Sequence, residues 1–110
     1  MGFEVSNNND WVVLSIEDRI DSFNYDDFKS EMEKLVDKKK ARVALKLNRA
    51  QFLSLSSIKY FSDVARRLEQ KGGKLALLGT PEKLKRQIHI FASLKSFALF
   101  RSEEEWHNDL

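Results

Sequence analysis

The chain contains no cysteine, one proline and four glycines among its 110 residues. Without cysteine it has no disulfide, no thiol nucleophile and no thiolate metal ligand, which is compatible with a reducing compartment. The scarcity of proline and glycine, and the lack of low-complexity segments, argue against intrinsic disorder. A chain of this length suits one compact domain, and we predict a single domain over residues 1–110.

Long apolar runs are also missing. No run reaches the roughly 20 residues that a membrane-spanning helix needs, and the first residues lack the features of a secretory signal. We therefore expect a cytoplasmic protein with no membrane partner.

Charge of neither sign dominates. The 19 basic and 17 acidic residues give a net charge of +2, which is too balanced to predict a polyanionic partner. The lysine run at 38–40 is interpreted as a solvated loop at a helix end, where cations are favoured.

The residues that are present recur with two periods. Alternating or continuous β-branched and apolar runs predict strands, whereas apolar spacings of three and four predict helices. The predicted strands cover residues 3–5, 11–16, 42–47, 74–79 and 97–100. The predicted helices are one with Phe23, Phe28, Met32, Leu35 and Val36 on a single face, one over 56–70, a third opened by Thr80 and Pro81, and a short last one opened by Ser102.

Polar and small residues mark the boundaries of these elements. An Asn-rich turn at 7–10 joins the first two strands into a hairpin. Asp21, Ser22 or Asn24 can cap the first helix, and the glycines at 72–73 stop the second. Thr80 is the predicted N-cap of the third helix, with Pro81 at its first position, and Ser102 with Glu105 matches a capping box.

Helices that alternate with strands require crossover connections, and these produce a mostly parallel sheet covered by helices. The predicted fold class is therefore α/β: a mixed, mostly parallel sheet of about five strands, with a β-hairpin start and about four helices.

The chain resembles the STAS family, which includes the sporulation anti-anti-sigma factors, over residues 11–106. Members carry a pattern near Leu-Asp-Leu-Ser followed by Phe-Ile-Asp-Ser-Ser-Gly-Leu. Here the two parts stand as Leu45-Lys46-Leu47-Asn48 and Phe52-Leu53-Ser54-Leu55-Ser56-Ser57-Ile58. Residues 19–22 (Arg-Ile-Asp-Ser), 71–79 and 97–105 fit further family segments. The resemblance implies a STAS-like fold and a non-enzymatic, protein-binding role as an anti-sigma factor antagonist.

The resemblance also implies a site. It places the family's regulatory, phosphorylated serine at Ser56, while Ser54, Leu55 and Ser57 replace the family's Asp, first Ser and Gly. A phosphate at a helix N-terminus meets unpaired N–H groups, so it is tolerated locally while it changes the surface that a partner meets. The implied partner is an anti-sigma factor or serine kinase-type protein. Its expected contacts are Ser54, Ser57, Lys59 and Tyr60, with Arg19, Asp21 and Ser22 from the neighbouring loop.

Other interpretations stay open. The three serines could be ordinary helix caps, and a small-ligand-sensing domain without a phospho-switch is one alternative. Nucleic-acid binding would use basic residues on two helices, namely Arg66, Arg67, Lys71, Lys83, Lys85 and Arg86. An enzyme has little support, because His89 and His107 accompany no catalytic motif, and we expect no cofactor, metal or catalytic residue. The first strand, as an unpaired edge, could also pair two copies into a homodimer.

Overall fold

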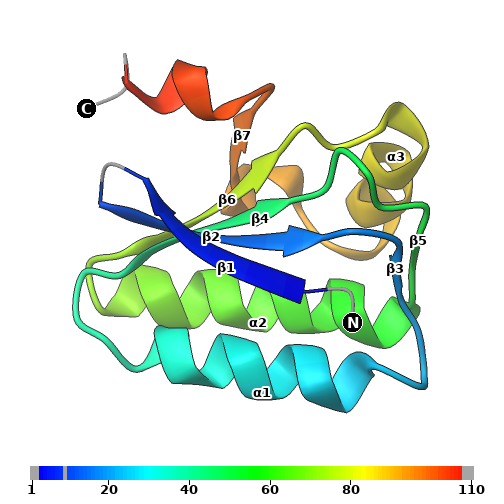
Figure 1. Cartoon of the computed structure of the whole chain (residues 1–110), viewed down its shortest axis with the longest axis horizontal. Helices are drawn as coiled ribbons and strands as arrows, with labels where there is room; N and C mark the ends of the chain where they lie inside the picture. Colours follow the sequence, from blue (N-terminus) through cyan, green and yellow to red (C-terminus); the bar gives the residue numbers. More distant parts are fainter. Residues whose placement is uncertain (1–2, 9, 108–110) are drawn as a thin grey trace.

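A five-stranded mixed sheet forms the centre of the structure, a computed structural model that describes residues 3–8 and 10–107 (Figure 1). Its strand order is β1-β2-β4-β6-β7, in which β1 is antiparallel to β2 and the other neighbours are parallel. The strands are β1 (Phe3–Asn8), β2 (Trp11–Ile16), β4 (Arg42–Lys46), β6 (Lys74–Leu78) and β7 (Ala98–Phe100). The predicted α/β class, five-stranded sheet and hairpin start are thus confirmed.

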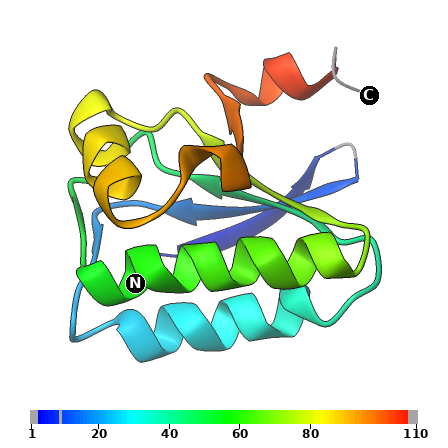
Figure 2. The same cartoon turned by 180° about the vertical axis from the view of Figure 1, so that it is seen from behind.

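Three α-helices connect the parallel strands: α1 (Tyr25–Val36), α2 (Leu55–Gln70) and α3 (Glu82–Phe91). Two opposite views show α1 and α2 side by side under the same face of the sheet (Figures 1 and 2). The remaining turns are short 3-10 helices, η1 (Leu94–Ser96) and η2 (Glu103–His107). The prediction of about four helices was therefore one too many for the described residues, because the last segment forms only the short 3-10 turn that such brief pieces favour.

The main core fills the space between the sheet and these helices. Strand residues such as Leu14 and Leu45 alternate with residues of the other face, as the pleat requires, and they are fully buried against Phe28, Phe61 and other helix residues. This burial explains why the two helices show apolar spacings of three and four.

A second, smaller cluster occupies the opposite face of the sheet. It consists of buried residues from three strands, namely Trp11, Val13, Ala44, Ala76 and Leu78.

The last 3-10 turn, η2, contacts the sheet through Glu103. Its carboxylate accepts a hydrogen bond from Asn8 Nδ2 of β1 at 2.8 Å and lies 3.7 Å from Lys46 Nζ of β4. The predicted capping box is altered, since Glu105 accepts from the backbone N–H of Arg101 rather than of Ser102.

Two predicted helix starts were wrong. The first helix begins at Tyr25, with Asn24, one of the three predicted caps, at its N-cap position but without a side-chain capping bond. Phe23 is 95% exposed instead of lying on its buried face. The third helix begins at Glu82: Pro81 is its N-cap, with an extended ψ of 146°, and its carbonyl accepts from Lys85 N–H at 2.8 Å. Thr80 therefore lies outside the helix, because the extended Pro81 delays the first helical turn by one residue.

The other boundaries differ by smaller amounts. Strand β1 continues to Asn8, so the predicted turn at 7–10 starts later, and Asp10 adopts the left-handed φ of 71° that such a turn uses. Residue 9 of that turn lies outside the described residues. Helix α2 ends at Gln70, just before the two glycines, as predicted. The lysines at 38–40 are exposed in a turn, which confirms the loop interpretation.

Candidate partner-binding site at the start of helix α2

The loops that precede α1 and α2 are joined by a small sheet that the sequence did not reveal. Strand β3 (Arg19–Ile20) pairs in parallel with β5 (Phe52–Leu53), with Arg19 opposite Phe52. The backbone N–H of Ser54 then donates to the carbonyl of Ile20 at 2.9 Å. This pairing places the loop at residues 19–22 beside the start of α2, as the predicted site required.

The three serines at this helix start have different roles. Ser54 is the N-cap, and its hydroxyl accepts from the backbone N–H of Ser57 at 3.2 Å. Ser57 is fully buried and its hydroxyl donates to the carbonyl of Ser54 at 2.7 Å. Ser56, the second residue of α2, is exposed, and the described part of the chain holds no hydrogen-bond partner for its side chain. The helix is thus capped without using Ser56.

Two residues expected to contact a partner lie behind this surface instead. Ser57 has no exposed area and Tyr60 only 6%, because both side chains point from α2 into the protein. Ser57 therefore adds no bulk to the surface, although it replaces a glycine of the family pattern. Lys59, between them, is exposed and the N-cap Ser54 is half-buried. Of the four contacts predicted at this helix start, only these two therefore remain accessible.

The loop before α1 is held in a fixed shape by reciprocal hydrogen bonds between Asp21 and Asn24. The Asp21 carboxylate accepts from Asn24 N–H at 3.2 Å and Phe23 N–H at 2.9 Å, and the Asn24 side chain accepts from Asp21 N–H at 2.8 Å. Asn24 also donates to the carbonyl of Arg19 at 2.8 Å. Asp21 thus shapes the loop, whereas Arg19 and Ser22 are exposed.

Large apolar side chains lie exposed on these two loops. Phe23 is 95%, Phe52 44% and Leu55 42% exposed. We call the surface formed by Arg19, Ser22, Phe23, Phe52, Leu55, Ser56 and Lys59 the entry surface. Sequence reasoning missed its apolar members, because it assigned Phe23 to a buried helix face and treated the other two only as family-pattern positions.

The electrostatics of the entry surface favour a negative group at Ser56. The first N–H groups of a helix have no intrahelical partner and carry partial positive charge. Ser54 satisfies only the N–H of Ser57, and the first turn of α2 contains no acidic residue. A phosphate on the Ser56 hydroxyl would therefore meet unpaired N–H groups of its own helix, and the exposed Lys59 follows three residues later on the same helix.

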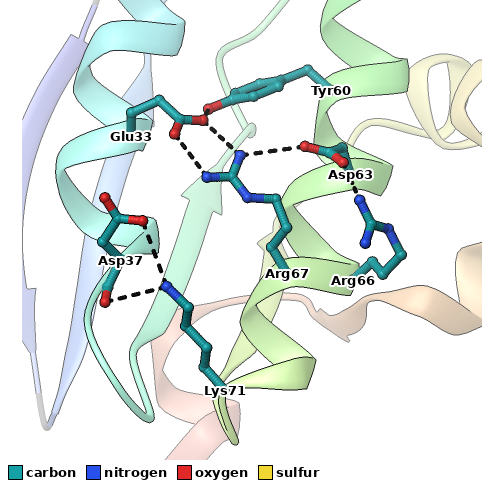
Figure 3. A network of polar contacts seen from close by, with 7 residues as sticks. All are labelled: Glu33, Asp37, Tyr60, Asp63, Arg66, Arg67 and Lys71. Atoms are coloured by element: carbon teal, nitrogen blue, oxygen red, sulfur yellow. Dashed lines mark hydrogen bonds and ion pairs between the residues drawn. The ribbon is translucent and has the colours of Figure 1, made fainter.

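A polar network behind the entry surface fixes α2 against α1 (Figure 3). Tyr60 donates to Glu33 at 2.5 Å, and Arg67 donates to both oxygens of Glu33 at 2.7 and 2.8 Å. The hydrogen bonds from Arg67, and then from Tyr60, lower the pKa of Glu33 from 4.5 to about 2. Burial, together with the carboxylate of Glu33, raises the pKa of Tyr60 well above its usual value.

The basic residues considered for nucleic-acid binding are largely offset on α2. Arg66 pairs with Asp63, Arg67 with Glu33, and Lys71 lies 3.5 Å from Asp37 (Figure 3). These carboxylates reduce the positive charge that this helix presents, so the structure gives the nucleic-acid alternative no coherent basic face on α2.

The histidines, the acidic residues and the helices bear on the enzyme, metal and membrane alternatives. His89 is exposed on α3, and the side chain of His107 lies outside what the structure describes. Within residues 3–8 and 10–107, no three His, Asp or Glu side chains gather as a metal site would require. No helix in these segments combines the length and apolar character needed to cross a bilayer.

The sequence pattern of the STAS domain matches residues 3–106. The chain belongs to the STAS domain family. No curated protein matches it closely enough to count as a relative, so further similarity comes from solved structures.

An anti-sigma factor antagonist from Mycobacterium paratuberculosis is 17% identical with a TM-score of 0.82, and the alignment covers 97% of this chain and 91% of that one. The phosphorylated form of SpoIIAA, a Bacillus cell fate determinant, is 19% identical with a TM-score of 0.75 and 97% of both chains covered. The STAS domain of a SulP transporter from Vibrio cholerae is 11% identical with a TM-score of 0.68, over 91% and 80%. At these identities the likeness establishes the fold.

Proposed function

We propose that this STAS domain is a non-enzymatic regulatory module of the anti-sigma factor antagonist type. It binds an anti-sigma factor or serine kinase-type protein through the entry surface, and phosphorylation of Ser56 switches that binding off. Family membership and the fold shared with anti-sigma factor antagonists support the class of function.

The observation that carries the proposal is the contrast between Ser56 and its two neighbouring serines. Ser54 and Ser57 are engaged in capping α2, whereas the Ser56 hydroxyl is exposed and unengaged among the described residues. A kinase can reach such a hydroxyl without opening the helix. The switch position is therefore accessible, and its modification leaves the cap intact.

The exposed apolar residues supply the binding energy that the proposal needs. Aromatic and aliphatic side chains at the centre of an interface contribute most of its affinity. Phe52 precedes the serine segment at 54–57 and Leu55 lies within it, and each is more than 40% exposed. A dianionic phosphate on Ser56 would place charge and bound water among these side chains, which opposes the desolvation that docking requires.

Ser54 replaces the Asp of the family pattern and takes over its capping role. Ser and Asp both serve as N-caps, and Ser54 makes the capping bond at 3.2 Å. The cap therefore does not require the carboxylate. What the substitution alters is the charge that a kinase would encounter two residues before Ser56.

The proposal is tested by affinity capture from the native host with the wild type, Ser56→Glu and Ser56→Ala as parallel baits. The wild type and Ser56→Ala are expected to retain a serine kinase-type protein, and Ser56→Glu is expected to lose it. The captured kinase with ATP should then phosphorylate the wild type at Ser56 and leave Ser56→Ala unmodified. Equal capture by all three baits contradicts the switch, and phosphate found only on another serine contradicts the assigned position.

A further inference from the structure

The edge strand β1 is exposed over its four central residues and lacks most of the devices that usually protect an edge. Its residues 4–7 are exposed on both faces of the sheet. The register with β2 runs without interruption from Phe3–Ile16 to Asn8–Trp11, so no bulge bends the strand away. It contains no proline or lysine, and its single charge is Glu4. Natural sheets normally block such an edge with short length, charge, proline or a bulge.

The opposite edge of the sheet differs. Strand β7 has three residues against six in β1, and it lies between the two 3-10 turns η1 and η2. A three-residue edge offers little backbone for pairing, so β1 is the edge that can accept another strand.

The hairpin determines which backbone groups of β1 face outward. Asn8 lies opposite Trp11 with two residues between them, and the pair that closes such a hairpin is hydrogen bonded. Hydrogen-bonded and non-hydrogen-bonded pairs alternate along an antiparallel ladder. Asn8, Ser6 and Glu4 therefore direct their N–H and C=O groups toward β2, whereas Asn7, Val5 and Phe3 direct theirs outward.

We propose that two copies of this chain associate through antiparallel pairing of their β1 strands, centred on Val5. The outward-facing N–H and C=O groups of Phe3, Val5 and Asn7 can pair with the same groups of a second copy related by a two-fold axis through Val5. Val5 then lies opposite Val5 of the second copy, and Phe3 of each copy lies opposite Asn7 of the other. The two five-stranded sheets become one continuous sheet.

The side chains suit this pairing. Val5 is 49% exposed, and the pairing covers it with an identical β-branched side chain, which packs well on a sheet. The only charged residue of the strand, Glu4, meets the neutral Ser6 of the second copy, so no like charges face each other across the new ladder.

The flank of α1 next to β1 is complementary to itself as well. Phe3 packs against Phe28 of α1 with ring centroids 5.6 Å apart. A hollow of about 340 Å³ beside Phe3 is lined by Asp27, Glu31 and Lys34. A two-fold axis perpendicular to the sheet keeps both α1 helices on one face and makes them antiparallel. The acidic Asp27 end of one flank is then directed toward the Lys34 end of the other.

Cysteine scanning tests the register of the pairing. Because the chain has no native cysteine, any disulfide must involve the introduced residue. In a hydrogen-bonded antiparallel pair the Cα atoms are about 5.5 Å apart, which is within the range of a disulfide. Val5→Cys is therefore expected to form an intermolecular disulfide under mild oxidation. The matched variants Glu4→Cys and Ser6→Cys place the two sulfurs out of register by two residues, beyond the roughly 7 Å limit, and are expected to remain largely monomeric.

Sedimentation equilibrium tests the association itself. The unmodified protein is expected to approach twice the chain mass of 12.8 kDa as its concentration rises. Val5→Lys, which sets two cations opposite each other, should abolish the doubled mass. At concentrations where the wild type is monomeric, it should leave the thermal unfolding midpoint unchanged. Glu4→Lys, whose new charge faces Ser6, should retain it.

Three outcomes overturn the proposal. One is a single 12.8 kDa species at every soluble concentration. Another is equal crosslinking at residues 4, 5 and 6. The third is preferential crosslinking of Leu99→Cys on β7, which would place the contact at the other edge of the sheet.

Discussion

Arg67 on α2 donates hydrogen bonds of 2.7 and 2.8 Å to the two carboxylate oxygens of Glu33 on α1 (Figure 3). Tyr60 donates to the same carboxylate. A bidentate guanidinium–carboxylate pair fixes orientation as well as distance. These contacts therefore help to fix how α2, which carries part of the entry surface, sits against α1.

Glu33→Gln is expected to destabilise the protein by about 1–2 kcal/mol, because it removes the charge that two donors share. The effect stays modest, since the Arg67 and Glu33 side chains are 28% and 36% exposed and solvent screens them. Urea denaturation measures the change. The control is Glu31→Gln, which removes the exposed pair with Lys34 and should cost less than about 0.5 kcal/mol. Equal losses in both variants would contradict a special role for Glu33.

The same carboxylate predicts a pH dependence of stability. Its pKa is lowered from 4.5 to about 2 in the folded protein, so the unfolded chain binds the proton more readily. The stabilisation is therefore complete above pH 4.5 and is lost as the pH falls toward 2. Unfolding free energies measured across this window should fall more steeply for the wild type than for Glu33→Gln. Parallel curves would show that Glu33 does not carry this dependence.

The N-cap of α2 predicts opposite outcomes for two substitutions of Ser54. Ser54→Ala removes the acceptor for Ser57 N–H and is expected to cost about 1 kcal/mol. Ser54→Asp keeps an acceptor and adds charge near the positive end of the helix, so its stability should equal or exceed that of the wild type. Thermal unfolding distinguishes the two, and a destabilised Ser54→Asp would contradict the assigned cap.

Ser56→Glu and Ser57→Glu separate a surface switch from a structural serine. Ser56 is exposed at the second position of α2, where a carboxylate suits the helix dipole, so Ser56→Glu should leave the unfolding midpoint unchanged or slightly raised. Ser57 is fully buried, and a carboxylate there should destabilise the fold by several kcal/mol. Circular dichroism melts check both. A large loss in Ser56→Glu would mean that the glutamate cannot report on a switch.

Much of the fold followed from the sequence because its local signals agree with its packing. The β-branched run at Trp11–Ile16 became a buried strand, and the apolar spacing over 56–70 became α2 with only its first residue shifted. The family pattern predicted a site at the serine segment, and that assignment stays a prediction. Apolar periodicity was enough to predict a strand or helix wherever the burial of its residues depends on their position within that element.

The rest depended on contacts between distant segments. Strands β3 and β5 have two residues each, too few to show a period, and they exist because Ile20 and Leu53 are buried together. Phe23 fits the helical spacing by sequence, yet the Asp21–Asn24 turn delays the helix and exposes it. Tyr60 is likewise buried through distant contacts, since its ring packs against Phe28 and its hydroxyl donates to Glu33, 27 residues away in the chain.

Phe23 is the residue of the entry surface that best separates binding from stability. With 95% of its surface exposed, Phe23→Ala should change the unfolding free energy by less than about 0.5 kcal/mol. The reciprocal bonds of Asp21 and Asn24 hold its position before binding, which lowers the entropic cost of docking. An aromatic side chain presented in this way should act as an anchor, so its removal should weaken partner binding about tenfold or more.

Isothermal titration of the captured kinase-type partner measures this loss. The matched control is Ile90→Ala, because Ile90 is also a large apolar residue, 71% exposed, but lies on α3 outside the entry surface. It should leave the affinity unchanged. Equal weakening by the two variants would show that the partner contacts α3 as strongly as the Phe23 loop, and unchanged affinity in Phe23→Ala would remove that loop from the interface.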